Sequence, residues 1–233
     1  MKELETGRQE LSYAGILSSP RGADYVLLKR VVDISVALFL LVLFGPLMLL
    51  IAVAIKLYSP GPVLFRQERV GKDGTLFYML KFRSMRVGSD TQAQQHREHV
   101  QRLIKENVRP EDLGAASLKL NGDRRITGLG RILRKLSLDE LPQLINVLRG
   151  EMSIVGPRPP LPYEYELYNG WHKQRMQVLP GITGLWQVTA RNRVSFDEMV
   201  HIDLEYIESM NLWLDLQIMV RTPVEMVRGK GGG

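Results

Sequence analysis

The chain has 233 residues, enough for one large domain or two small ones with a real core. Lysine and arginine number 31 against 25 aspartates and glutamates, and the formal charge of +6 favours anionic partners such as phospholipid head groups, nucleotides, phosphates or nucleic acid. Cysteine is absent, which excludes disulfides, thiolate metal sites and a cysteine nucleophile.

Residues 1–28 are polar and lack periodicity, which predicts a flexible N-terminal tail. The stretch from Ile34 to Ile55 then runs for 22 residues without a charge. That length is sufficient to cross a bilayer. A core helix of a soluble protein is the alternative, but apolar residues on every side of the helix favour the membrane.

A proline interrupts this apolar run near its middle. Pro46 cannot donate a helical hydrogen bond, so it predicts a kink or a break. Basic residues flank both ends, with Lys29 and Arg30 before the run and Lys56 after it. The positive-inside rule therefore chooses no crossing direction and fits both ends on the cytoplasmic side. We favour a re-entrant membrane helix–break–helix over residues 29–58, with a straight span as the alternative.

Residues 59–228 have the pattern of a mixed domain. The segments Val63 to Val70 and Thr75 to Phe82 surround a Gly-Lys-Asp-Gly turn and predict a small β-hairpin. Amphipathic or capped segments predict helices over residues 89–107, 129–136, 141–148, 163–174 and 195–208. The fold class expected is therefore α+β and mainly helical.

The last third of the chain contains two ambiguous segments. Residues 180–184 are expected to form a turn that leads into residues 185–188, a short strand or buried extended segment. The apolar residues 212–227 either pack on the core or lie in the membrane interface. Residues 229–233 form a glycine-rich tail, native or added in cloning, that we leave out of the domain.

Two adjacent carboxylates, Asp139 and Glu140, stand at the start of an expected helix, directly after the basic stretch 131–135. Ser137 and Glu140 have the spacing of a capping box, but Pro142 would then fall beyond the first turn and cost a hydrogen bond. A cap nearer Asp139 avoids that cost. Acids at helix starts are common as simple partners of the helix dipole. Carboxylates beside cations and backbone N–H groups also suit a metal-phosphate site, so both readings stand.

One arginine is held between prolines. Pro157 and Pro159 flank Arg158 and restrict the local backbone, so its side chain is expected to point in a fixed direction. A rigidly presented guanidinium suits bidentate binding of phosphate. The other basic residues are scattered among acids rather than forming a run, so nucleic acid is not an expected partner.

With these motifs in order, the chain resembles the bacterial sugar transferase family, the monotopic phosphoglycosyl transferases. The resemblance covers residues 29–228 and begins with the proline-broken apolar hairpin. The blocks that follow are Gln67-Glu68-Arg69-Val70-Gly71, Lys81-Phe82-Arg83-Ser84-Met85, Asp139-Glu140-Leu141-Pro142-Gln143, Ser153-Ile154-Val155-Gly156-Pro157-Arg158-Pro159 and Pro180-Gly181-Ile182-Thr183-Gly184. The resemblance implies that the hairpin enters and leaves on the cytoplasmic face of the bacterial inner membrane, where the catalytic domain would lie.

The resemblance also implies a reaction. Hexose-1-phosphate would pass from a UDP-sugar to undecaprenyl or another polyprenyl phosphate, with release of UMP, as the first membrane step of polysaccharide or glycoconjugate synthesis. The family pattern makes Asp139 the nucleophile of a phosphosugar-aspartyl intermediate and places Mg²⁺ at Asp139 and Glu140. Glu140 would support the metal or the acceptor.

The same pattern assigns the cations. Arg134, Arg158 and Arg191 match the family's phosphate-binding arginines, and Lys81 matches its basic strand residue. The polar insert over residues 89–107 resembles the hexose-1-phosphate branch more than the diacetamido-sugar branch, so galactose or glucose is the expected sugar. Membrane phospholipid, a homodimer and downstream glycosyltransferases are the further partners expected.

Overall fold

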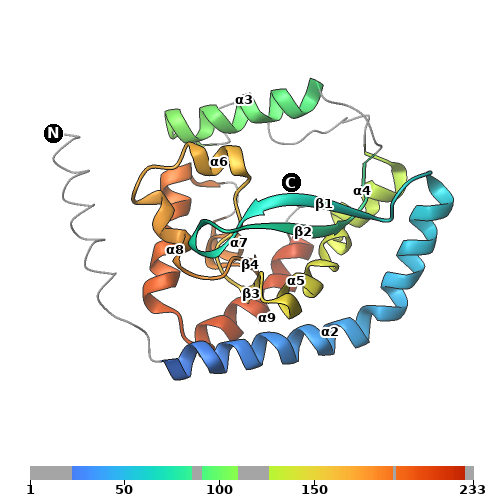
Figure 1. Ribbon diagram of the computed structural model, residues 1–233, viewed down its shortest axis with the longest axis horizontal. Helices are drawn as coiled ribbons and strands as arrows, with labels where there is room; N and C mark the ends of the chain where they lie inside the picture. Colours follow the sequence, from blue (N-terminus) through green and yellow to red (C-terminus); the bar gives the residue numbers. More distant parts are fainter. Residues whose placement is uncertain (1–22, 86–90, 110–125, 191–192, 229–233) are drawn as a thin grey trace.

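The computed structural model of the protein describes residues 23–85, 91–109, 126–190 and 193–228. It is mainly helical with small sheets, which confirms the expected α+β class (Figure 1). The longer helices are α2 (Ala23–Tyr58), α3 (Thr91–Glu106), α8 (Phe196–Ser209) and α9 (Leu212–Arg228). The shorter helices are α4 (Gly128–Lys135), α5 (Gln143–Arg149), α6 (Pro162–Glu166) and α7 (Leu185–Thr189). The 3-10 helices are η2 (Lys72–Gly74), η3 (Leu138–Glu140) and η4 (His172–Gln177).

The predicted hairpin is present. β1 (Leu64–Val70) and β2 (Leu76–Phe82) pair antiparallel, with Leu64 opposite Phe82 and Val70 opposite Leu76. The alternation of side chains buries Phe77 and Met79 but leaves Leu76 and Tyr78 exposed, as a half-buried strand requires. β1 occupies one edge of β2, and the other edge faces α5.

A second sheet was not predicted as such. β3 (Ser153–Val155) and β4 (Gly181–Thr183) pair in parallel, and β4 falls within the expected turn over residues 180–184. Glycine makes this pairing sterically possible, because a Cβ on Gly181 would lie only 2.1 Å from the backbone nitrogen of Gly156. The two glycines thus bring the segment before Arg158 against the segment before α7.

Two predictions from local pattern were wrong in this region. Residues 185–188 are helical rather than extended, since they form most of α7. A short apolar run does not distinguish a buried strand from a buried helix, and Trp186 and Val188 are buried in either case. The helix expected over residues 163–174 is divided into α6 and η4.

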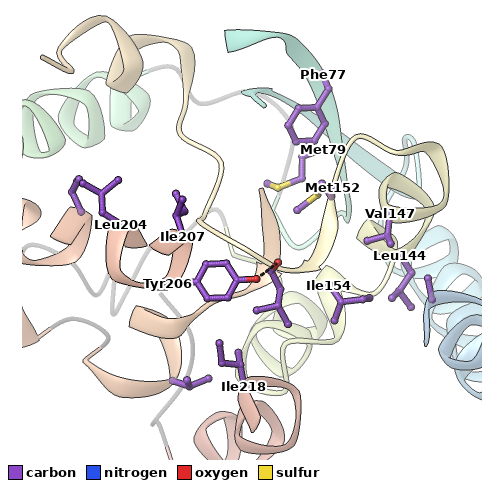
Figure 2. Close-up of a cluster of buried hydrophobic side chains, with 14 of the residues drawn as sticks. Phe77, Met79, Leu144, Val147, Met152, Ile154, Leu204, Tyr206, Ile207 and Ile218 are labelled. Carbon is purple, nitrogen blue, oxygen red and sulfur yellow. Dashed lines mark hydrogen bonds between the residues drawn. The ribbon is translucent and has the colours of Figure 1, made fainter. Parts of the chain in front are cut away.

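The main hydrophobic core lies where α5, β2, β3, α8 and α9 meet. Figure 2 shows the side chains from these elements that converge there: Phe77, Met79, Leu144, Val147, Met152, Ile154, Leu204, Tyr206, Ile207 and Ile218. The hydroxyl of Tyr206 donates to the carbonyl of Val155 at 3.1 Å, so the one polar tip in this cluster is satisfied. Because α5 closely follows Asp139 and Glu140 in the chain, the packing of α5 in this core also holds these two acids in position.

The apolar N-terminal segment is a single helix of 36 residues that continues through Pro46. Figure 1 shows α2 bending in its second half, and a proline inside a helix is a known cause of such a bend. The helix begins at Ala23, so it includes six residues that we had expected in the tail. Among the described residues, α2 is the helix long and apolar enough to cross a membrane by length and composition.

Both halves of α2 contact the same domain. Near its start, the guanidinium of Arg30 donates to the carbonyls of Val147 and Leu148, at 2.6 and 3.0 Å. Near its end, Ile51 and Ile55 are buried in a second cluster with side chains of β2 and α4. The first half of α2 is thus attached to α5, and the second half packs against the hairpin and α4.

Candidate active site

The acid pair lies in η3, a 3-10 turn between α4 and α5, rather than inside a helix. Ser137 is in the left-handed region with φ 53°, and its side chain makes no capping hydrogen bond. The capping box between Ser137 and Glu140 is therefore absent. The alternative, a cap nearer Asp139, is closer to the structure but still three residues early, because Pro142 is itself the N-cap of α5, where its missing N–H does no harm.

The two carboxylates have different surroundings. Asp139 is buried, with 7% of its surface exposed, whereas the side chain of Glu140 is 30% exposed and its Oε1 accepts a hydrogen bond from Lys81 Nζ at 2.8 Å. Burial raises the pKa of Asp139, and the charge of Glu140 raises it further. Burial alone would raise the pKa of Glu140 too, but the charge of Lys81, helped by Arg158, holds it below its usual range.

The predicted cations gather around these acids. Lys81 projects from β2, and Arg134 stands in the last turn of α4, where its Nε donates to Ser84 Oγ at 3.0 Å. Both charges act to lower the pKa of Asp139, against the effect of burial. Gly130 lets α4 approach this strand end, because a Cβ there would lie 2.0 Å from the carbonyl oxygen of Ser84.

Arg158 is exposed, although its neighbours Pro157 and Pro159 are buried. The expectation of an arginine presented from a rigid, proline-bounded backbone therefore matches the structure. Its charge acts on Glu140, which places it on the same side of the site. Arg191, the remaining predicted cation, lies outside the described residues.

A cleft joins part of this set. Its lining residues are Arg69, Met79, Lys81, Glu140, Gln143, Arg158, Pro159, Gly181, Ile182 and Gln187. Three of the predicted site residues line this cleft: Glu140, Lys81 and Arg158. Asp139 lies beside it, next to Glu140 in the chain, and the charges of Lys81 and Arg134 both act on Asp139. The cleft is thus lined by charged side chains together with Met79, Ile182 and the amide side chains of Gln143 and Gln187.

Arg69 is the residue of this cleft that sequence reasoning missed. It is buried, with 4% of its surface exposed, and its guanidinium donates to the carbonyl of Pro159 and to Gln67 Oε1, both at 2.8 Å. Burial, followed by the charge of Arg158, lowers its pKa to about 10, so Arg69 stays a cation at neutral pH. A charged residue in a short polar strand is usually read as solvent-facing. The only sequence signal was its place in a block matching the family.

The donor set suits a magnesium ion. Mg²⁺ prefers oxygen ligands and is commonly bound by one or two carboxylates together with substrate phosphates and water. Asp139 and Glu140 supply two adjacent carboxylates, of which Glu140 lines the cleft and Asp139 lies beside it. Within the described part of the chain, no group of three or more histidine, aspartate or glutamate side chains forms a complete metal cage. The residues therefore fit a metal that shares its coordination with a bound phosphate.

Known proteins with similar sequences match most of this chain. The family model described as bacterial sugar transferase matches residues 24–229. The exopolysaccharide production protein ExoY of Rhizobium meliloti is 41% identical over 194 residues, which cover 83% of each chain. A UDP-glucose:undecaprenyl-phosphate glucose-1-phosphate transferase of Caulobacter vibrioides is 43% identical over 202 residues, 83% of this chain and 67% of that protein.

Some relatives are longer. The galactosyl transferase CpsE of Streptococcus agalactiae is 39% identical over 209 residues, which are 89% of this chain but 44% of that protein. The match therefore spans less than half of CpsE and most of ExoY. The chain belongs to the bacterial sugar transferase family.

Proposed function

We propose that this protein transfers hexose-1-phosphate from a UDP-sugar to undecaprenyl or a related polyprenyl phosphate and releases UMP, the first membrane step of polysaccharide or glycoconjugate synthesis. The observation that carries the proposal is the buried carboxylate of Asp139 next to Glu140, with Lys81 and Arg158 facing the same cleft. The names of the relatives, which specify undecaprenyl phosphate and glucose-1-phosphate or exopolysaccharide production, support this class of reaction.

The proposed reaction has two displacements at one phosphorus. In the first, a carboxylate oxygen of Asp139 attacks the phosphorus bonded to the sugar, and the bond from that phosphorus to the bridging oxygen of UMP breaks. In the second, an oxygen of the lipid phosphate attacks the same phosphorus, and Asp139 leaves as a carboxylate. Each step forms one phosphorus–oxygen bond and breaks one, so no oxidant or net proton is required.

The surroundings of the two acids support the division of labour. Glu140 is engaged by Lys81 and has a lowered pKa, so it is a weak base and a weak nucleophile. Asp139 has a raised pKa, and no ion pair to its carboxylate is present among the described residues. Its oxygens are therefore more basic and better suited to attack. Arg158 and Arg134 would neutralise the diphosphate as the charge moves to UMP.

Asp139 and Glu140 would hold Mg²⁺ together with the donor phosphates. When bound, the ion would neutralise the charge that develops on the leaving UMP. Lys81 keeps Glu140 ionised through the 2.8 Å contact, which preserves an acceptor at this position. Asp139 and Glu140 are adjacent in the 3-10 turn η3, so their side chains point in different directions and would contact different atoms of the substrate.

The proposed membrane placement is re-entrant, with both ends of α2 and the catalytic domain on the cytoplasmic face of the inner membrane. The attachment of both halves of α2 to one domain supports this, since a straight span would carry one end to the far side. Apolar side chains line the opposite face of the helix: Leu38, Phe39, Val42, Leu43, Leu49, Leu50 and Val53 are exposed. The apolar face of α9 supports an interfacial position for that helix as well: Trp213, Leu216, Val220 and Val224 are exposed.

The decisive experiment traps the intermediate. Protein in detergent with Mg²⁺ is mixed with UDP-glucose or UDP-galactose, with N-acetylated UDP-sugars as a comparison, and quenched before any lipid phosphate is added. We expect a burst of UMP and a hexose-phosphate mass on the peptide that contains Asp139. Asp139→Asn should abolish both. An adduct on another residue, or UMP release that strictly requires lipid phosphate, would refute the covalent mechanism.

A further inference from the structure

The loop that presents Arg158 is held by an unusual set of contacts. Its prolines have no N–H to donate, so the position of the loop depends on what its carbonyls accept. All four carbonyls from Pro157 to Pro160 accept a hydrogen bond from another element. The donors, in order along the loop, are the backbone N–H of Gly181 (2.9 Å), the guanidinium of Arg175 (3.4 Å), the guanidinium of Arg69 (2.8 Å) and the backbone N–H of Val70 (3.0 Å).

Two of these donors are buried cations. Arg69 is 4% exposed and Arg175 is 1% exposed. Arg175 forms a short ion pair with Asp203, which is 1% exposed, while no ion pair to Arg69 is present in the described ranges. Burying a guanidinium costs free energy, and apolar residues of similar size often give a more stable protein. Stability alone therefore does not account for two buried arginines under one loop.

Arg158 itself is the exposed member of the group. Its backbone carbonyl rests on Arg175, and the next carbonyl along the chain rests on Arg69. The two buried guanidiniums approach from different elements, Arg69 from β1 and Arg175 from η4. Together they fix the peptide from which the Arg158 side chain projects into the cleft.

We propose that Arg69 and Arg175 are positioning residues for the proposed sugar-phosphate transfer, acting through Arg158 rather than on the substrate directly. The inference rests on the proposed function, because it assigns Arg158 to the donor diphosphate. A displacement of about 1 Å at such a group can reduce a rate by up to roughly 100-fold. Lysine at position 69 would keep the charge but could not donate to both Pro159 and Gln67 with a fixed fork.

A double-mutant cycle tests this. UMP release from a radiolabelled UDP-sugar is measured for Arg69→Lys in the parent and in an Arg158→Ala background, where the label keeps residual activity measurable. We expect about a tenfold loss of kcat/KM in the parent and less than twofold in the Arg158→Ala background, since a positioning residue has nothing left to position. Arg175→Lys should behave in the same way. The control is Arg66→Lys, the same substitution at an exposed position of the same strand, which should change neither background.

The outcomes are distinguishable from failure of the proposed function. If the parent releases no UMP from any UDP-sugar, the proposed function fails first. If the parent is active and Arg69→Lys lowers kcat/KM by the same factor in both backgrounds, Arg69 binds substrate itself and the inference is overturned. The inference is also overturned if Arg69→Lys leaves kcat/KM unchanged in the parent background. If Arg69→Lys fails to fold by thermal unfolding, Gln67→Leu replaces it, since this change frees one side of the Arg69 fork while leaving the buried charge in place.

Discussion

Replacing Asn146 by leucine should cost both stability and rate, because this side chain joins α5 to the hairpin. Asn146 is fully buried, and its Oδ1 accepts from the backbone N–H of Leu80 at 3.0 Å while its Nδ2 donates to the carbonyl of Tyr78 at 2.8 Å. The amide thus pairs with the open edge of β2 as the peptide of a neighbouring strand would. Nδ2 also donates to Glu151 at 2.6 Å.

The magnitude follows from what leucine leaves behind. Leucine has the same branched shape and a good helix propensity, so helix formation changes little, but its two methyl groups are bulkier than the amide and add a packing cost at this buried position. The N–H of buried Leu80 loses its partner, which costs about 1–3 kcal/mol, and the more exposed carbonyl of Tyr78 costs less. A total of about 2–4 kcal/mol corresponds to a fall in Tm of roughly 5–15 °C for a domain of this size.

The rate should fall as well, by about tenfold. β2 carries Lys81, and the residues before α5 carry Glu140, so Asn146 fixes the register that allows the 2.8 Å contact between them. Thermal unfolding in detergent and UMP release measure the two effects. Glu151→Gln is the matched control, since it keeps an oxygen acceptor for Asn146 and should stay within about 2 °C and twofold of the parent. A leucine variant as stable and active as the parent would refute the role assigned to this amide.

Three further predictions address the site and the membrane. Arg158→Lys should lower kcat/KM about tenfold, because an ammonium cannot supply two parallel donors; near-normal turnover would make it a general cation. Activity should fall at acidic pH as Asp139 is protonated. Because the charge of Glu140 raises the pKa of Asp139, Glu140→Gln should move this fall in activity to lower pH, and a shift to higher pH would contradict the argument. Single cysteines at Ser18 and Ser89 should both be labelled from the cytoplasm alone, whereas opposite-side labelling would favour a straight span.

The parts of the fold that follow from local chemistry could be predicted. The hairpin strands were placed to within one residue, because alternating side chains around a glycine-rich turn have few other solutions. The capping box of Ser195 and Glu198 opens α8 as expected, with the Ser195 Oγ accepting from the N–H of Glu198. The resemblance to the family had grouped Lys81, Glu140 and Arg158 in one site; these three residues line a single cleft, and Asp139 lies beside it.

The parts of the fold that depend on contacts between residues far apart in the sequence could not be predicted. β4 exists only because residues before Arg158 lie against it, and a three-residue parallel pairing has no periodic signal. Ser137 has the sequence of a cap, but the turn between α4 and α5 requires a left-handed residue there, which removes its side chain from capping. Arg69 reads as a solvent-facing strand residue until the 157–160 loop is known to cover it. In each case tertiary contact overrides local pattern.

Helix α2, the proposed membrane helix, is connected to the proposed catalytic groups by short, stiff paths. α5 begins three residues after Glu140 and ends where the guanidinium of Arg30 binds its last carbonyls, so about 10 Å of helix separates the acid pair from the start of α2. At the other end of α2, Arg83 donates to the carbonyls of Ser59 and Pro60 at 2.7 and 2.8 Å. Arg83 lies two residues after Lys81, directly after the end of β2. Both members of the ion pair between Lys81 and Glu140 are thus fixed to opposite ends of one helix. A lipid phosphate lies at a depth set by the bilayer, so the proposed reaction between it and Asp139 would require the protein to fix that depth, and these two attachments give α2 the means to do so.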